Sequence, residues 1–69
     1  MNDKSRILLH LTRYRTITPL EALECYGCYR LGARIWDLRR DGHDISTKMV
    51  TGTDRNGEPM RYAKYTLHE

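Results

Sequence analysis

The residues of this chain best suited to chemistry are four arginines in one short stretch, Arg30, Arg34, Arg39 and Arg40. Arg30 and Arg34 are about one helical turn apart, so in a helix their side chains project from the same side. A guanidinium donates paired hydrogen bonds to a phosphate or to the edge of a guanine base. The stretch therefore predicts contact with a polyanion.

The position of the charges supports this prediction more than their total does, because the formal net charge is only +3. The segment before the arginines carries Glu21 and Glu24, so an acidic segment adjoins a basic one. Such local asymmetry favours a positive face for a polyanion. An ordinary solvated basic surface is the alternative.

Two cysteines, Cys25 and Cys28, form a C-x-x-C. No second cysteine pair follows, and the three histidines lack metal-ligand spacing. We interpret both cysteines as free thiols at a helix–turn junction, with metal binding as the alternative. We predict no metal site and no other cofactor.

Enzyme motifs are absent from the sequence, which contains no phosphate-binding glycine loop, zinc-protease helix or nucleophile elbow. A chain of 69 residues also leaves little room for an enzyme cleft, so we expect a non-enzymatic protein. Hydrophobic residues make up 39% and charged residues 30%, which predicts one folded domain over residues 1–69. Neither a signal peptide nor a bilayer-long apolar run occurs, so we expect a cytoplasmic protein with no membrane partner.

The elements that must position the arginines are predicted from periodicity and capping residues. A first helix is expected over about 4–15, capped by Asn2 or Asp3. Its apolar stripe consists of Ile7, Leu8, Leu11 and Tyr14. The β-branched residues 16–18 that follow are expected to add a brief strand to a later sheet.

Thr18 begins the clearest local signal in the sequence. Its hydroxyl is suited to capping a helix, Pro19 suits the first helical position, and Glu21 completes a capping box. A second helix is therefore expected over about 19–26, and Gly27 allows the positive φ of a sharp exit. The side chains that this helix is expected to bury are Leu20 and Leu23.

A third helix is predicted over about 29–41, ending at Gly42. Its core stripe is Leu31, Ile35 and Leu38. The side chains that point away from this stripe are Tyr29, Arg30, Ala33, Asp37 and Arg40. Trp36 lies off the centre of the stripe, and the sequence leaves open whether it is buried.

Two alternating segments, about 45–50 and 60–67, predict strands, and the Asn56–Gly57 pair between them predicts a hairpin. One strand is expected to place Ile45, Thr47 and Met49 on a single face. The other is expected to turn Ala63, Tyr65 and Leu67 inward.

Three helices followed by a hairpin predict an α+β fold, the winged helix-turn-helix. More narrowly, residues 17–23, 27–31, 33–35 and 37–39 with Gly42 resemble a family of small phage and prophage winged-helix proteins. The resemblance extends from about Lys4 to Leu67 and implies that fold together with binding of double-stranded DNA. Ala22 precedes Gly27 by five positions, one more than in the commonest pattern, which predicts a longer turn.

On the DNA hypothesis, the third helix enters the major groove and the hairpin serves as a wing. Asp37 either accepts a hydrogen bond from cytosine or orients Arg34 or Arg40, and Arg39 braces the end of the helix. Thr18 and the amides after it are expected at a phosphate. The residues expected at the DNA are Thr18, Tyr29, Arg30, Ala33, Arg34, Asp37, Arg40, Lys48, Arg55, Arg61 and Lys64.

The regulatory context follows from the resemblance, which implies a phage or prophage regulator. The rival hypothesis is a module that docks on a host protein, since the chain has five tyrosines and one tryptophan. Joint exposure of Trp36, Tyr29 and Tyr62 would favour it. A homodimer is compatible with both hypotheses.

Overall fold

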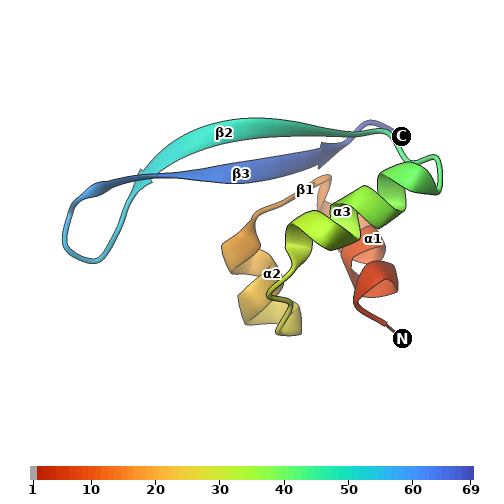
Figure 1. The fold of residues 1–69 in the computed structure, drawn as a ribbon, viewed down its shortest axis with the longest axis horizontal. Coiled ribbons are helices and arrows are strands. Elements are labelled where there is room, and N and C mark those ends of the chain that lie inside the picture. The colour runs from red at the N-terminus through yellow and green to blue at the C-terminus, as the bar shows by residue number, and fades with distance from the viewer. Residues whose placement is uncertain (1) are drawn as a thin grey trace.

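The computed structural model describes residues 2–69. Residue 1, with which the predicted domain begins, lies outside the described residues. The elements follow in the order α1 Asp3–Tyr14, β1 Thr16–Ile17, α2 Pro19–Tyr26, α3 Leu31–Arg40, β2 Ile45–Thr53 and β3 Pro59–Leu67 (Figure 1). The α+β order of three helices and a hairpin, with a brief strand after the first helix, confirms the prediction.

Helix α1 begins where the Asn2 side chain accepts a hydrogen bond from the Ser5 amide at 2.9 Å, so Asn2 is the cap. It ends at Arg15, whose φ of 73° places it in the left-handed region. Ile7 and Leu11 of its apolar stripe are fully buried. Tyr14 was expected in that stripe but is exposed, because the helix ends there and its ring lies beside His10 at the margin of the core.

The capping box at the start of α2 is confirmed. Thr18 Oγ1 accepts from the Glu21 amide at 3.3 Å, and Glu21 Oε1 accepts from the Thr18 amide at 3.0 Å. At the other end, Gly27 adopts the expected left-handed conformation with φ 63°. The Gly27 and Cys28 amides then close the helix by donating to carbonyls of its last turns.

The expected burial of Leu20 and Leu23 is wrong, since these side chains are 61% and 40% exposed. Helix α2 has only eight residues and directs Ala22 and the half-buried Tyr26, one turn apart, at the core. The two leucines therefore lie on the side of α2 that faces the turn and the hairpin.

Helix α3 begins at Leu31, two residues later than predicted. Cys28 is buried and anchors the turn, while Arg30 has non-helical φ and ψ of −117° and 52°. The connection therefore occupies residues 27–30, which fits the longer turn expected from the glycine spacing. Leu31, Ile35 and Leu38 form the buried stripe as predicted.

The sheet has the strand order β1-β3-β2, and both pairings are antiparallel. The hairpin register runs without interruption from Ile45↔Leu67 to Thr53↔Pro59, so both strands are longer than expected. Its loop is closed by the Asp54 carboxylate, which accepts from the Asn56 and Glu58 amides at 2.9 Å each.

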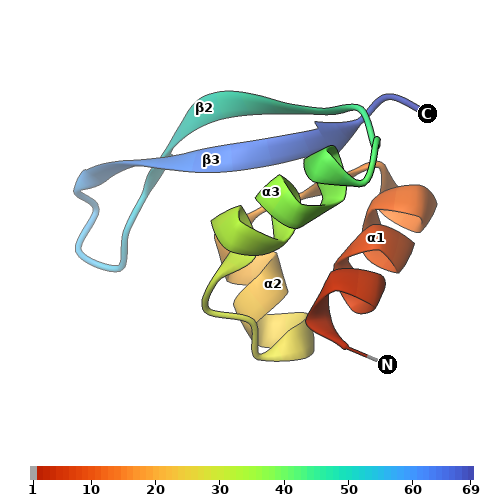
Figure 2. The same cartoon turned by 45° about the vertical axis from the view of Figure 1, so that its right-hand side comes forward.

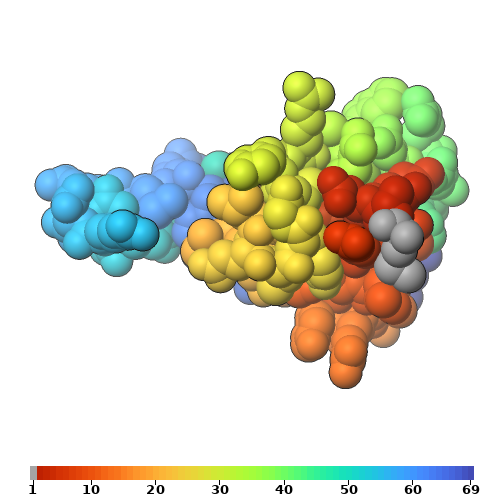
Figure 3. Space-filling view, turned by 90° about the horizontal axis from the view of Figure 1, so that it is seen from below, coloured from red at the N-terminus to blue at the C-terminus, as the bar shows by residue number. Residues whose placement is uncertain are grey.

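The helices lie on one side of the sheet in both ribbon views, and the far end of the hairpin extends past them (Figures 1 and 2). Seen from below, this end projects from the helical body (Figure 3). The base of the hairpin joins the core, since Ile45 and Leu67 are buried and the half-buried Tyr65 packs against it, whereas Thr47 and Met49 are exposed. The alternation of side chains along the strands was thus predicted. The sequence did not predict how little of the inner face of the hairpin the core covers. The buried apolar residues are Ile7, Leu11, Ile17, Ala22, Cys28, Leu31, Ile35, Leu38, Ile45 and Leu67.

Candidate nucleic-acid interface

The structure brings more of the predicted DNA-contacting residues together on or beside the outer face of α3 than anywhere else. Opposite the buried stripe lie Ala33, Trp36 and Arg40, all of them exposed. Trp36 is 58% exposed, which resolves the question that the sequence left open. The face consists of an apolar centre with charged groups at its edges.

Asp37 lies beside this face and links two of the arginines. Its Oδ2 is 3.3 Å from Nη2 of Arg34, and its Oδ1 is 3.7 Å from Nη2 of Arg40. The Arg40 guanidinium also stacks on Trp36, with Cζ 4.7 Å from the ring centroid. The expected pairing of Asp37 with neighbouring arginines is thus present, while its contact with cytosine stays a prediction.

Arg30 and Tyr29 stand at the N-terminal end of α3, where recognition helices meet base edges. Tyr29 is 87% exposed, and Arg30 is exposed as the residue that precedes the helix. Across residues 2–69, the Arg30 side chain makes no ion pair and no hydrogen bond. Arg30 is consequently the cation at this end of α3 that is most accessible to a ligand.

Arg39 turns to the hairpin instead of outward. Its Nε donates to the Ile45 carbonyl at 2.8 Å, and its Nη2 donates to Thr47 Oγ1 at 2.6 Å. These bonds fasten the end of α3 to the first residues of β2. The bracing role expected for Arg39 is confirmed.

The cations of the hairpin are spread over two faces and the tip. Lys48 and Lys64 are directly opposite each other in the register. By strand alternation they lie on the face opposite that of Ile45 and Leu67, so they point away from the core at the base. Arg61 and the loop residue Arg55 are exposed on the projecting part. The structure thus does not unite these four side chains with the α3 face into one patch.

A family model described as "Winged helix-turn-helix domain" matches residues 2–69 of the chain. The chain belongs to the winged helix-turn-helix domain family. No curated protein matches it. Membership of this family suggests DNA as the partner of the winged helix, and such small domains are typically not enzymes.

The N-terminus of α2 in this winged helix is occupied by its own side chains. Besides the two bonds of the capping box, Thr18 Oγ1 donates to Glu21 Oε1 at 3.1 Å. Pro19 has no amide hydrogen, so the first turn offers a phosphate little beyond the Leu20 amide. Contact of Thr18 with DNA remains a prediction, and Glu21 places a negative charge beside it.

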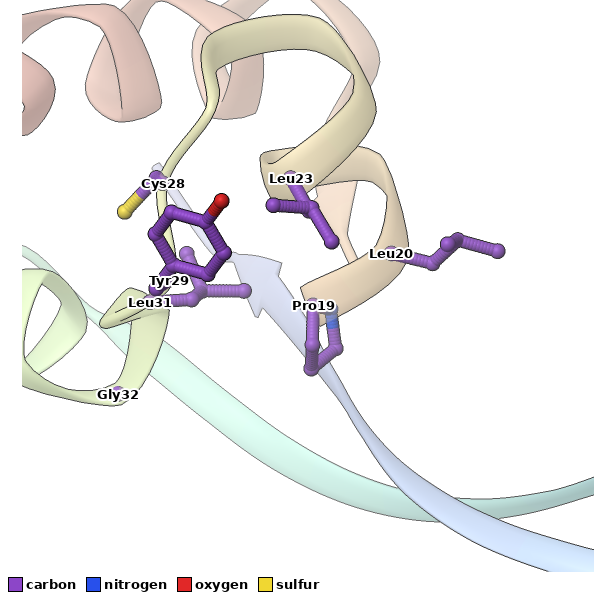
Figure 4. Close-up of a pocket in the computed structure, with 7 residues that line it drawn as sticks. All are labelled: Pro19, Leu20, Leu23, Cys28, Tyr29, Leu31 and Gly32. Atoms are coloured by element: carbon purple, nitrogen blue, oxygen red, sulfur yellow. The ribbon is translucent and has the colours of Figure 1, made fainter.

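Two apolar grooves lie beside α2, and neither was predicted because Leu20 and Leu23 were expected to be buried. The first groove, of about 370 Å³, is lined by Pro19, Leu20, Leu23, Cys28, Tyr29, Leu31 and Gly32. Leu23 and Leu31 are directed into it and Leu20 points away (Figure 4). The second, of about 340 Å³, is lined by Thr18, Pro19, Leu20, Gly52, Thr53, Met60 and Tyr62.

The two cysteines and the other possible metal ligands of residues 2–69 do not gather into a metal site. Cys25 is exposed, Cys28 is buried, and both are free. Within residues 2–69, no three His, Cys, Asp or Glu side chains converge as a metal ion would require. In the same part of the chain, every helix is too short or too polar to span a membrane.

Proposed function

We propose that this winged helix binds double-stranded DNA, with α3 in the major groove and the β2–β3 hairpin as its wing. The observation that carries the proposal is the placement of α3. Its apolar stripe is buried in the core, while no other element covers its opposite face. The major groove is wide enough to receive such a face.

Arg30 is the residue from which we expect the strongest contribution. It lies at the helix end that is proposed to enter the groove, and within residues 2–69 no carboxylate pairs with it. Arg34 is half-buried and is paired with Asp37, so less of its charge is free for a phosphate. We expect Arg55, an exposed residue of the hairpin loop, to contact the DNA backbone or the minor groove.

Regulation of transcription in a phage or prophage is the context that we propose for this DNA binding. The resemblance of residues 17–42 to small phage and prophage winged helices supports it. Action in the cytoplasm follows from the same proposal, because phage and prophage DNA is transcribed there.

The decisive experiment is a salt titration of binding to random-sequence duplex DNA. We expect the affinity to fall steeply as the salt concentration rises. A plot of log affinity against log salt concentration should fall with a slope of about 0.9 per phosphate neutralised. Trp36, the single tryptophan, should report binding by a change in fluorescence. Arg30→Ala should weaken binding and flatten the slope, whereas the control Arg6→Ala, an exposed arginine of α1, should not. Failure of the wild-type protein to bind duplex DNA at low salt would refute the proposal.

Docking on a host protein is the second candidate, favoured by the exposure of Trp36 and of Tyr29, the latter in the lining of the first apolar groove. Tyr62, the third aromatic of the hypothesis, is half-buried in the second groove. We would compare capture from a nuclease-treated bacterial lysate by the wild-type protein and by Leu20→Ser. A specific partner that is retained by the wild type and lost by the variant would support docking. Equal recovery would argue against it.

A further inference from the structure

Asp37 has an arrangement that the proposed DNA contact does not by itself explain. It is half-buried beside the outer face of α3, and each of its carboxylate oxygens faces a different arginine. A negative charge at this place opposes the approach of any phosphate. If the helix bound DNA through charge alone, a neutral residue at this position would give a higher affinity.

The geometry points to Asp37 as a specificity-determining residue: we propose that it withholds Arg34 and Arg40 from phosphates and makes α3 select a G·C pair. This inference rests on the proposed DNA binding. In the free protein, one carboxylate neutralises part of the charge of two guanidiniums. Arg40 is held on a second side by the Trp36 ring. Random DNA therefore meets a face whose cations are already engaged.

The hydrogen-bonding groups of the bases determine which DNA sequence can free Arg34 and Arg40 from Asp37. An ionised carboxylate only accepts hydrogen bonds. The donors in the major groove are the amino groups of cytosine and adenine, whereas guanine and thymine present acceptors. A G·C pair thus offers the Asp37 carboxylate a donor on cytosine, and it offers O6 and N7 of guanine to a freed guanidinium. Opposite an acceptor edge, Asp37 would lose its arginine partners without a replacement.

The test compares Asp37→Asn with Glu24→Gln, because both remove one negative charge and Glu24 is an exposed residue of α2 that makes no ion pair within residues 2–69. Each protein is titrated with random duplex DNA at several salt concentrations. Each is also used to select sequences from a duplex library with a randomised segment. Unchanged far-UV circular dichroism and thermal midpoints establish that the variants are folded.

We expect Asp37→Asn to bind random duplex about 5–10 times more tightly than Glu24→Gln, with a salt slope steeper by about 0.9–1.8 because one or two more phosphates are neutralised. The wild type should select cytosine at one position by about tenfold or more, and Asp37→Asn should shift that position toward adenine, the base that an amide pairs with. Glu24→Gln should keep the cytosine preference.

The failures are distinguishable. A wild-type protein that binds no DNA refutes the proposed function itself. A wild type that binds, together with an Asp37→Asn variant that has the affinity of Glu24→Gln and an unchanged selected sequence, overturns only the role of Asp37. Weaker binding by Asp37→Asn also overturns that role, since the carboxylate would then support the arginines at the DNA.

Discussion

The hydroxyl of Tyr26 lies 2.8 Å from Nδ1 of His10, and this hydrogen bond joins the last residue of α2 to the middle of α1. His10 is only 6% exposed, and its ring meets the Tyr26 ring edge-on. Among the described residues its Nε2 has no hydrogen-bond partner, and Glu21 Oε2 is 3.9 Å away. His10 thus makes a polar contact within an otherwise apolar core.

Replacing Tyr26 with phenylalanine should lower the free energy of unfolding by about 1–2 kcal/mol, because Nδ1 of the buried His10 would lose its partner. Urea unfolding at neutral pH measures this change. The matched control is Tyr14→Phe, since the Tyr14 ring also contacts His10, 4.7 Å between centroids, but is exposed. Equal losses in the two variants would show that the hydrogen bond contributes nothing.

Arg39→Met should loosen the base of the hairpin without unfolding the helices. The substitution keeps an aliphatic chain but removes the donors to Ile45 and Thr47, and hydrogen bonds to charged groups contribute about 1.5–3 kcal/mol. Hydrogen exchange should accelerate in the first half of β2. Arg40→Met, at an exposed neighbouring position, serves as the control. Unaltered exchange in β2 would contradict the bracing role.

Reversing the charge of Lys48, which lies directly opposite Lys64, should have opposite effects on stability and on DNA affinity. Like charges directly opposite in a sheet are unfavourable, so Lys48→Glu should stabilise the protein by about 0.2–1 kcal/mol. The double variant with Lys64→Glu should lose that gain, because it restores like charges. If the pair contacts phosphate in the wing, Lys48→Glu should also weaken DNA binding and reduce its salt dependence. Higher stability with unaltered DNA affinity would remove the pair from the interface.

The ion pair between Lys4 at the start of α1 and Asp41 at the end of α3 should be lost at acidic pH. The Lys4 ammonium, 2.8 Å from Asp41, donates a hydrogen bond that holds the pKa of this carboxyl below its usual value. A lowered pKa in the folded state gives stability that is present above the unfolded value of about 3.9 and is lost as the pH falls through the folded one.

Lys4→Met should therefore be less stable than the wild type near neutral pH, and the difference should shrink as the pH falls below about 4. Unfolding midpoints in urea at a series of pH values measure it, with Arg6→Met as the control on the same helix. A difference that is the same at every pH would mean that Lys4 acts through packing of its aliphatic chain.

Local signals in the sequence were sufficient for much of the fold. The bonds between Thr18 and Glu21 and the left-handed Gly27 depend on neighbours within three or four residues, so short-range spacing predicts them. The stripe from Leu31 to Leu38 is a further case, because its period alone identifies the buried side.

The errors arose where burial depends on distant segments. Leu20 has the spacing of a core residue, yet whether anything covers it depends on the path of the hairpin, more than thirty positions later in the sequence. Tyr29 was placed in α3 because its sequence permits a helix. In the structure Cys28 is buried in the turn and Arg30 has non-helical φ and ψ, so the helix begins only at Leu31. For the candidate site, spacing predicted that Asp37 would reach Arg34 or Arg40. The spacing also put Trp36 off the centre of the buried stripe, but it did not decide whether another segment would cover the ring.

The core holds the hairpin at its base, through the buried Ile45–Leu67 pair and the half-buried Tyr65, while the far pairs of its nine-residue strands extend past the helices (Figure 1). Folding of the helical body thus places almost no constraint on the composition of the tip. Substitutions and changes of length in the loop at residues 54–58 should change the free energy of unfolding little. In this architecture the wing is the part that evolution can alter most freely, so relatives with the same helices are expected to diverge first in what their tips touch.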